Sequence, residues 1–296
     1  MSEFGAGTSE FFVPGESGIK KVKVDDPGNT VGRRLPRALA PGVHWVGDCA
    51  LFPTPQGLDK GKLEHAYSSA FLVVGDERSI LVDTGHPQDW PVLKRQLDGL
   101  FAAGAAPLAF VFPTHSEVTH GGNLGRLLRR YPAARGVGGD MGDLSLIFPD
   151  VADRLDDVRV GDVLDLGNRR FHFVDAVFRD LPDTLWGYDE QEKVLFSSDG
   201  LGFGHYHGEE HCGKFAEEVP DLPIPELTGL FLEYALYWTR LKDVEPQIAR
   251  LRRLVFEDYP VKIIAGAHGS PVTDPEMTME RIEQGMRELG ERYALR

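Results

Sequence analysis

The 296-residue chain has a length at which α/β and β-rich folds often form one domain, and its 42% apolar residues suffice for a large core. Its formal net charge of -14 argues against the basic surface that nucleic acid or an anionic membrane requires, so we predict neither as a partner. Two cysteines give no disulfide framework, and neither a membrane-spanning apolar run nor a signal peptide is evident, so we predict a cytoplasmic protein.

The first 40 residues differ in character from the rest of the chain. They are rich in glycine, proline and charge and show no sustained apolar period, apart from a short strand expected over 20–26. We therefore predict an N-terminal arm over 1–40 and one domain over 41–296. Phe11 and Phe12 offer an apolar anchor for this arm, either on its own domain or on a partner chain, so a homodimer is one prediction.

Short apolar runs and helical patterns alternate through the remaining chain. Residues rich in β-branched and aromatic types predict strands over 43–46, 69–74, 79–82, 108–112, 163–166, 170–177, 194–198 and 261–265. Apolar spacing predicts helices over 91–100, 122–131, 223–256 and 275–290. The apolar face of the third helix is expected to consist of Leu230, Tyr234, Leu241, Ile248 and Leu251. Two successive β-then-α halves indicate an α/β sandwich of two sheets with helices outside.

Imidazole and carboxylate side chains follow several of these strands. In chain order they are Asp83, His115, Glu117, His120, Asp199 and His268. Strand ends are where open α/β sheets build ligand sites, and imidazoles and carboxylates together bind metal ions. The stretch FVFPTHSEVTHGGN at 110–123 is the densest of these groups, because it places two histidines and a carboxylate within six residues. The sequence therefore predicts a metal site.

The order of the motifs, DTG, HxExxH, a carboxylate loop, SSDG and AHG, resembles the metallo-β-lactamase superfamily over residues 41–275. The glutamate in HxExxH and the block LPDTLWGYDEQEKVLFSSDG look like the metal-binding domain of flavodiiron proteins in particular, where the motif is HxExDH. The resemblance implies the metallo-β-lactamase fold, an αββα sandwich of two mixed β-sheets flanked by helices, with two metal ions bound at one edge.

The resemblance also implies a role for each of these positions. The metal ligands would be His115, Glu117, His120, Asp199 and His268, with Asp199 bridging the two metals. Asp83 would support the site without binding metal. Two positions depart from the family pattern, since Thr119 stands where a ligating aspartate is usual and Asp180 where a histidine is usual. We expect Thr119 to lie beside the ligands, and Asp180 either to bind metal or to cap a turn before Pro182.

These departures bear on the identity of the metal. His120, His268 and Asp199 would form a set of two histidines and one carboxylate, which is typical of non-haem iron that activates oxygen. His115, Glu117, Asp199 and Asp180 would form a carboxylate-rich set that suits iron or manganese better than zinc. We expect two iron ions, with manganese and zinc as alternatives. We expect no flavin in this chain, because no pattern for the flavodoxin-like domain of flavodiiron proteins is recognisable.

Three functions remain open at this point. The first is a non-haem di-iron oxidoreductase, with Glu117 and Asp199 as catalytic residues, that activates dioxygen to oxidise a small organic substrate and draws on an external electron donor. The second is a hydrolase of an ester, lactone or thioester, and the third a di-iron oxygen sensor without turnover. The segment GFGHYHGEEHC matches no zinc pattern with two clear pairs, and from it we expect His205 as a contact for substrate.

Overall fold

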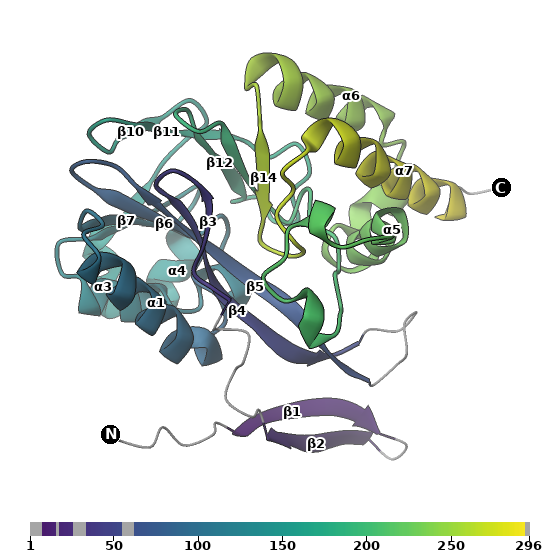
Figure 1. Ribbon diagram of the computed structural model, residues 1–296, viewed down its shortest axis with the longest axis horizontal. Coiled ribbons are helices and arrows are strands. Elements are labelled where there is room, and N and C mark those ends of the chain that lie inside the picture. Colours follow the sequence, from purple (N-terminus) through teal and green to yellow (C-terminus); the bar gives the residue numbers. More distant parts are fainter. Residues whose placement is uncertain (1–7, 16–17, 26–33, 55–61, 294–296) are drawn as a thin grey trace.

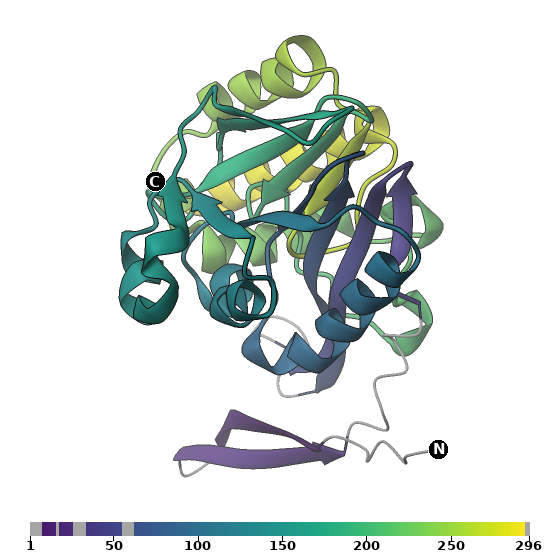
Figure 2. The same cartoon turned by 90° about the vertical axis from the view of Figure 1, so that its left-hand side faces the viewer.

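The computed structural model describes residues 8–15, 18–25, 34–54 and 62–293. Two mixed β-sheets pack face to face, and helices cover the outer face of each, so the expected αββα sandwich is confirmed (Figures 1 and 2). Residues 8–25 carry a separate two-stranded sheet of β1 (Thr8–Gly15) and β2 (Gly18–Asp25), which agrees with the expected strand near residue 20. The side chains of Phe11 and Phe12 lie outside the described residues.

The first sheet has seven strands in sequence order. They are β3 (Arg37–Ala40), β4 (Val43–Pro53), β5 (Leu63–Val74), β6 (Ser79–Val82), β7 (Leu108–Phe112), β8 (Arg135–Gly138) and β9 (Leu155–Asp157). The pairs from β3 to β6 are antiparallel, and those from β6 to β9 are parallel. The β4–β5 hairpin is longer than the sequence indicates, since pairing continues from Val43 opposite Val73 to Pro53 opposite Leu63.

The second sheet has five strands, also in sequence order. They are β10 (Val163–Asp165), β11 (Arg170–Asp175), β12 (Leu185–Asp189), β13 (Val194–Ser198) and β14 (Ile263–Gly266). Strand β12 was not expected from the sequence, although its residues Leu185, Trp186 and Tyr188 are typical of strands. The parallel pairing of β13 with β14 brings two strand ends that are distant in sequence to the same edge of the sheet.

Seven α-helices are assigned among the described residues. They are α1 (Trp90–Ala102), α2 (Val118–Gly121), α3 (Leu124–Arg130), α4 (Gly142–Ile147), α5 (Ile224–Ala235), α6 (Glu245–Arg253) and α7 (Pro275–Tyr293). Short 3-10 helices occur at Pro87–Asp89, Pro149–Arg154, Glu209–His211, Ala216–Glu218 and Tyr237–Leu241, and a π-helical turn at Leu254–Asp258. Within the described part of the chain, no helix has the length and apolarity needed to cross a bilayer.

The helix expected over 223–256 is not continuous, and this expectation was wrong. Helix α5 ends at Ala235, and α6 begins at Glu245 with Pro246 in its first turn, where a proline is well accommodated. Because the 3-10 helix Tyr237–Leu241 and the residues after it interrupt the α-helix, the expected apolar face is broken. Tyr234 and Leu241 are exposed rather than packed with Ile248 in the core.

Three apolar layers hold the sandwich together. Aromatic side chains from both sheets fill the central layer, where Phe112 of the first sheet meets Phe173 of the second with ring centroids 4.9 Å apart. Helices α1 and α3 bury leucines against the outer face of the seven-stranded sheet. Helices α5, α6 and α7 cover the five-stranded sheet in the same way. Packing on both faces leaves the strand ends as the place for polar side chains.

Candidate metal centre

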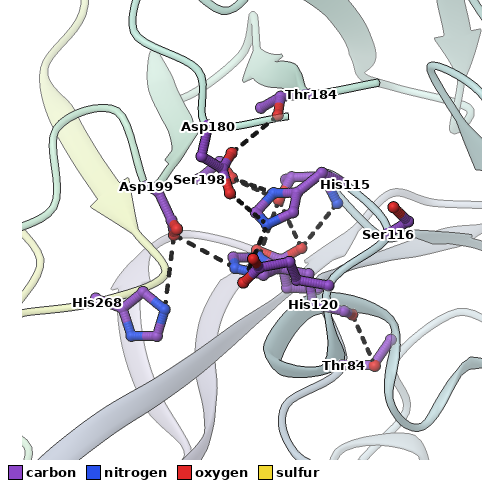
Figure 3. A network of polar contacts seen from close by, with 12 residues as sticks. Thr84, His115, Ser116, His120, Asp180, Thr184, Ser198, Asp199 and His268 are labelled. Atoms are coloured by element: carbon purple, nitrogen blue, oxygen red, sulfur yellow. Dashed lines mark hydrogen bonds and ion pairs between the residues drawn. The ribbon is translucent and has the colours of Figure 1, made fainter. Parts of the chain in front are cut away.

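The six expected ligands come from segments that follow strands of both sheets, and the structure brings them together (Figure 3). His115, Glu117 and His120 follow β7 of the first sheet. Asp180, Asp199 and His268 follow β11, β13 and β14 of the second. Two groups of potential ligands, each with donor atoms within 4.8 Å of one another, share His115: one adds His120 and Asp199, the other Glu117 and Asp180.

The short helix α2 sets the positions of the first three side chains. Glu117 precedes the helix with an extended backbone, and its carbonyl accepts the amide N–H of His120 at 3.0 Å. This turn brings His120 back beside His115, with ring centroids 3.8 Å apart. The HxExxH spacing therefore places the two imidazoles next to each other. The Glu117 side chain, which is 55% exposed, faces solvent.

Each of the three imidazoles is held through its Nδ1 atom. His268 Nδ1 lies 3.1 Å from the carbonyl of Tyr67, which can only accept, so this nitrogen carries the proton. His120 Nδ1 lies 3.1 Å from Asp83 Oδ2, and His115 Nδ1 lies 3.1 Å from Ser198 Oγ. In all three rings the Nε2 atom is directed at a carboxylate, and metal-binding histidines are generally held through the other ring nitrogen in this way.

One carboxylate, Asp83, positions two of these rings. It accepts the Thr114 amide N–H at 2.8 Å and the Thr114 hydroxyl at 2.9 Å, both on Oδ1. The Thr114 hydroxyl oxygen can then accept from Ser198 Oγ at 2.8 Å, and Ser198 in turn from His115 Nδ1. Asp83 thus holds His120 directly and His115 through two hydroxyl groups.

The carboxylates face the free Nε2 atoms. Asp199 Oδ1 lies 3.3 Å from His120 Nε2 and 3.6 Å from His268 Nε2, while Asp180 Oδ2 lies 3.2 Å from His115 Nε2. Glu117 Oε2 is more distant, at 4.0 Å from His115 Nε2. Asp199 therefore stands between two imidazoles, as a carboxylate with two metal neighbours would. The other oxygen of Asp180 accepts the Thr184 hydroxyl at 3.0 Å, so ligand and turn-capping roles are compatible.

The charges of these groups are strongly coupled. Burial alone would raise the pKa of Asp199, but His120 and His268 more than offset it and hold that pKa below its usual value. Burial likewise lowers the pKa of His120, and Asp83 and Asp199 outweigh burial and raise it. Burial raises the pKa of Asp180, whereas the nearby imidazole of His115 lowers the pKa of Glu117. Such paired, oppositely shifted groups in one site are typical of functional centres.

Two residues of the centre have left-handed backbones although they are not glycine. Asp83 has a φ of 58° and Ser198 a φ of 50°, and a bulge interrupts the pairing of β13 with β14 next to Ser198. Such conformations cost about 1–3 kcal/mol each and are concentrated at functional sites. Here they turn the Asp83 carboxylate and the Ser198 hydroxyl toward the imidazoles at the points where their strands end.

The remaining expected site residues differ in position. Thr119 lies on α2 next to the ligands, and its Oγ1 atom is buried without a hydrogen-bond partner. His205 is buried elsewhere, with its Nδ1 atom 3.2 Å from Ser270 Oγ, and its role as a substrate contact stays a prediction. Sequence reasoning did not find Thr114, Ser198 or the Tyr67 carbonyl, because hydroxyl and carbonyl groups that orient ligands have no distinctive spacing.

A substitution of Asp180 tests whether this residue binds metal. Asp180→Asn keeps an oxygen for the Thr184 hydroxyl but removes the charge facing His115. We expect the iron content after anaerobic reconstitution to fall from about two to about one per chain, since the carboxylate-rich position loses a ligand. Elemental analysis of the two proteins side by side measures this. Unchanged iron content would show that Asp180 only caps its turn.

Comparison with known proteins agrees with this geometry. A model of the metallo-beta-lactamase superfamily matches residues 64–212. A coenzyme F420H2 oxidase of Methanothermobacter marburgensis is 26% identical over 82% of this chain and 59% of its own length. An anaerobic nitric oxide reductase flavorubredoxin of Pectobacterium atrosepticum is 24% identical over 77% of this chain and 43% of its own.

Solved structures give the same result for the fold. The rubredoxin oxygen:oxidoreductase of Desulfovibrio gigas superposes with a TM-score of 0.66 at 20% identity, over 86% of this chain and 61% of that one. The expected resemblance to the superfamily and to flavodiiron proteins is therefore confirmed. The chain spans less than two thirds of the length of these relatives.

Proposed function

Because the chain belongs to the metallo-β-lactamase superfamily, we propose that its centre binds two iron ions and that the protein is an oxidoreductase that consumes dioxygen. The observation that carries the proposal is the arrangement of the imidazoles: His115, His120 and His268 are each held at Nδ1 and present Nε2 to a carboxylate. Relatives whose names describe an oxidase and a nitric oxide reductase support this class of reaction.

The residues of the site fit a metal ion on their own evidence. His115 Nε2, His120 Nε2 and Asp199 Oδ1 are buried atoms without a hydrogen-bond partner. Buried polar atoms are generally satisfied, and unsatisfied ones that converge on one point indicate an ion that supplies the interaction. The donor set holds three imidazoles and three carboxylates and lacks thiolate, which suits iron or manganese better than zinc.

Iron bound there would supply electrons to dioxygen. The residues of the chain provide the framework for this: Asp199 joins the two halves of the site, and the orienting bonds from Asp83, Ser198 and Tyr67 fix the ring planes. Glu117 is the carboxylate with access to solvent, because its side chain is 55% exposed, so we assign it the exchange of protons between site and water. The Asp180 and Asp199 side chains are buried beside the imidazoles of His115 and His120.

Residue 119 argues against hydrolysis. In hydrolases of this fold the aspartate expected there helps to bind metal and to orient the attacking water, and a neutral hydroxyl does so less well. Thr119 Oγ1 is buried and unpaired, so it offers no charge to an attacking water. For an oxidoreductase, the absence of this aspartate weakens metal binding less. The remaining ligands His120, His268 and Asp199 are a set of the kind that holds non-haem iron. We propose an external electron donor, either a small reduced cofactor or a redox protein.

The experiment is oxygen uptake by the iron-reconstituted protein with reduced flavin mononucleotide as the donor. Because free reduced flavin also reacts with dioxygen on its own, the protein-free rate is subtracted; we expect uptake above that rate of many equivalents of dioxygen per chain, and little above it in Asp199→Ala. The surface variant Asp98→Asn, which alters a carboxylate of α1 that pairs with Lys94, is the matched control and should retain the rate. A single stoichiometric uptake without turnover would replace the proposal with a sensor, and ester or lactone cleavage by a zinc form would replace it with a hydrolase.

A further inference from the structure

A second group of metal-binding side chains lies apart from the centre described above. Cys49 of β4 meets His207 and Cys212, which belong to the segment between β13 and α5. All three residues are buried, with exposed fractions of 1%, 4% and 0%. Their donor atoms lie within 4.8 Å of one another, and none of them belongs to the His115 groups.

The distances within this thiol–imidazole cluster match the edges of a tetrahedral metal site. Cys49 Sγ lies 3.7 Å from Cys212 Sγ and 3.4 Å from His207 Nε2, and these two edges carry the comparison; Cys212 Sγ lies 3.9 Å from the other nitrogen of His207, Nδ1. Zinc–sulfur bonds of about 2.3 Å and zinc–nitrogen bonds of about 2.0 Å imply tetrahedral edges of about 3.8 and 3.5 Å. A disulfide would need the sulfur atoms about 2.05 Å apart. The cluster therefore has the spacing of ligands around an ion.

The imidazoles of the cluster are oriented as ligands. His207 Nδ1 donates to the Gly208 carbonyl at 2.7 Å, which leaves Nε2, the atom beside Cys49, unprotonated. A fourth side chain is close: His65 donates from Nδ1 to the Cys49 carbonyl at 2.9 Å and interacts through its ring with Cys212. His65 and His207 pair through their backbones at 2.9 and 3.0 Å, which places their rings together, 6.1 Å apart and nearly parallel.

The thiols differ in their readiness to lose a proton. The hydrogen bond from Cys49 lowers the pKa of the Cys212 thiol to about 3 against the opposing effect of burial, with help from His207 and His65. Burial raises the pKa of Cys49, so this thiol donates to the neighbouring thiolate. One thiolate is thus ready for a metal ion, which is the form of cysteine that binds metals.

We propose that Cys49, His207 and Cys212, with His65 completing the set, bind a zinc ion distinct from the iron centre. Two thiolates and two imidazoles form a closed structural site in which no position is left for a substrate. The ion would fasten the long β4–β5 hairpin to the segment between β13 and α5. The proposal is independent of the proposed function, because it shares no ligand with that centre.

Cobalt substitution tests the proposal, because thiolate ligands give Co²⁺ an intense near-ultraviolet charge-transfer band that oxygen and imidazole ligands do not. We expect the wild-type protein, stripped of metal and titrated with Co²⁺, to develop this band with a final intensity that corresponds to about one thiolate-bound ion per chain. Cys49→Ser and Cys212→Ser should each abolish most of it. His211→Gln is the matched control, since the His211 ring lies 6.0 Å from that of His207 without belonging to the cluster.

Two further measurements make the result independent of how the variants fold. The band should persist in Asp199→Ala, which disables the iron centre alone, so failure of one site is distinguishable from failure of the other. In the wild-type protein bound zinc should protect both thiols from alkylation until a chelator is added. A wild-type protein without the charge-transfer band, or with Cys49 and Cys212 joined in a disulfide as purified, would overturn the proposal.

Discussion

His120→Ala is expected to leave the protein with little bound iron, well below the content of the wild type. His120 is fully buried, and its Nε2 atom faces Asp199 Oδ1 at 3.3 Å, so the change removes a ligand from the middle of the site. The change also leaves the Asp83 carboxylate without its imidazole partner. Iron, counted separately from zinc by elemental analysis after anaerobic reconstitution, is the quantity to measure.

Asp199→Ala should have the same effect, because this carboxylate faces both His120 and His268. The matched control for the histidine is His172→Ala, which removes an imidazole of β11 that pairs with Glu190, the residue directly after β12, away from the centre. Circular dichroism of each variant checks that the fold is retained. Full iron content in both His120→Ala and Asp199→Ala would refute the assignment of the site.

Asp83→Asn is expected to lower iron affinity by about 10–100-fold while leaving the fold largely intact. The amide oxygen can still accept both bonds from Thr114, and asparagine tolerates the left-handed backbone at φ 58°. The amide N–H₂ group then faces the Nδ1–H group of His120, so two hydrogen-bond donors oppose each other. His120 is driven to carry its proton on Nε2, which is the atom needed for the metal.

The measurement is an iron titration under anaerobic conditions that is monitored through the optical spectrum. Asp98→Asn is the control, because it makes the same aspartate-to-asparagine change on the surface of α1. A loss of affinity without a loss of thermal stability would distinguish orientation of His120 from a general packing role. Equal affinities in Asp83→Asn and wild type would show that the ring planes are set by packing alone.

The sequence predicts the sandwich and the centre well where the pattern that indicates them lies in residues close together in the chain. A buried strand followed at once by polar residues marks a strand end, and His115, Glu117 and His120 lie close enough in the chain to be recognised as one group. Asp199 and His268 are 69 residues apart, yet each follows a strand, and the parallel pairing of β13 with β14 brings them together. The resemblance to the metallo-β-lactamase superfamily indicated that these strand-end segments together form one metal centre.

Other features depend on contacts that no local pattern reveals. The thiol–imidazole cluster joins Cys49 to His207 and Cys212, which are 158 and 163 residues away along the chain. The break between α5 and α6 escaped detection because apolar spacing continues through it. Pro246 was the available signal, since a proline favours the first turn of a new helix over the middle of an old one.

The proposed iron centre draws its side chains from both sheets, so metal bound there would link folding to the supply of metal. A native fold that binds an ion absent from the unfolded chain gains stability by mass action, by about 4 kcal/mol when free metal exceeds its Kd a thousandfold. The halves that contribute His115 and His268 are separate layers joined otherwise by the central aromatic packing. With metal bound at the proposed centre, the free energy of unfolding of the protein would rise with the concentration of free metal around it.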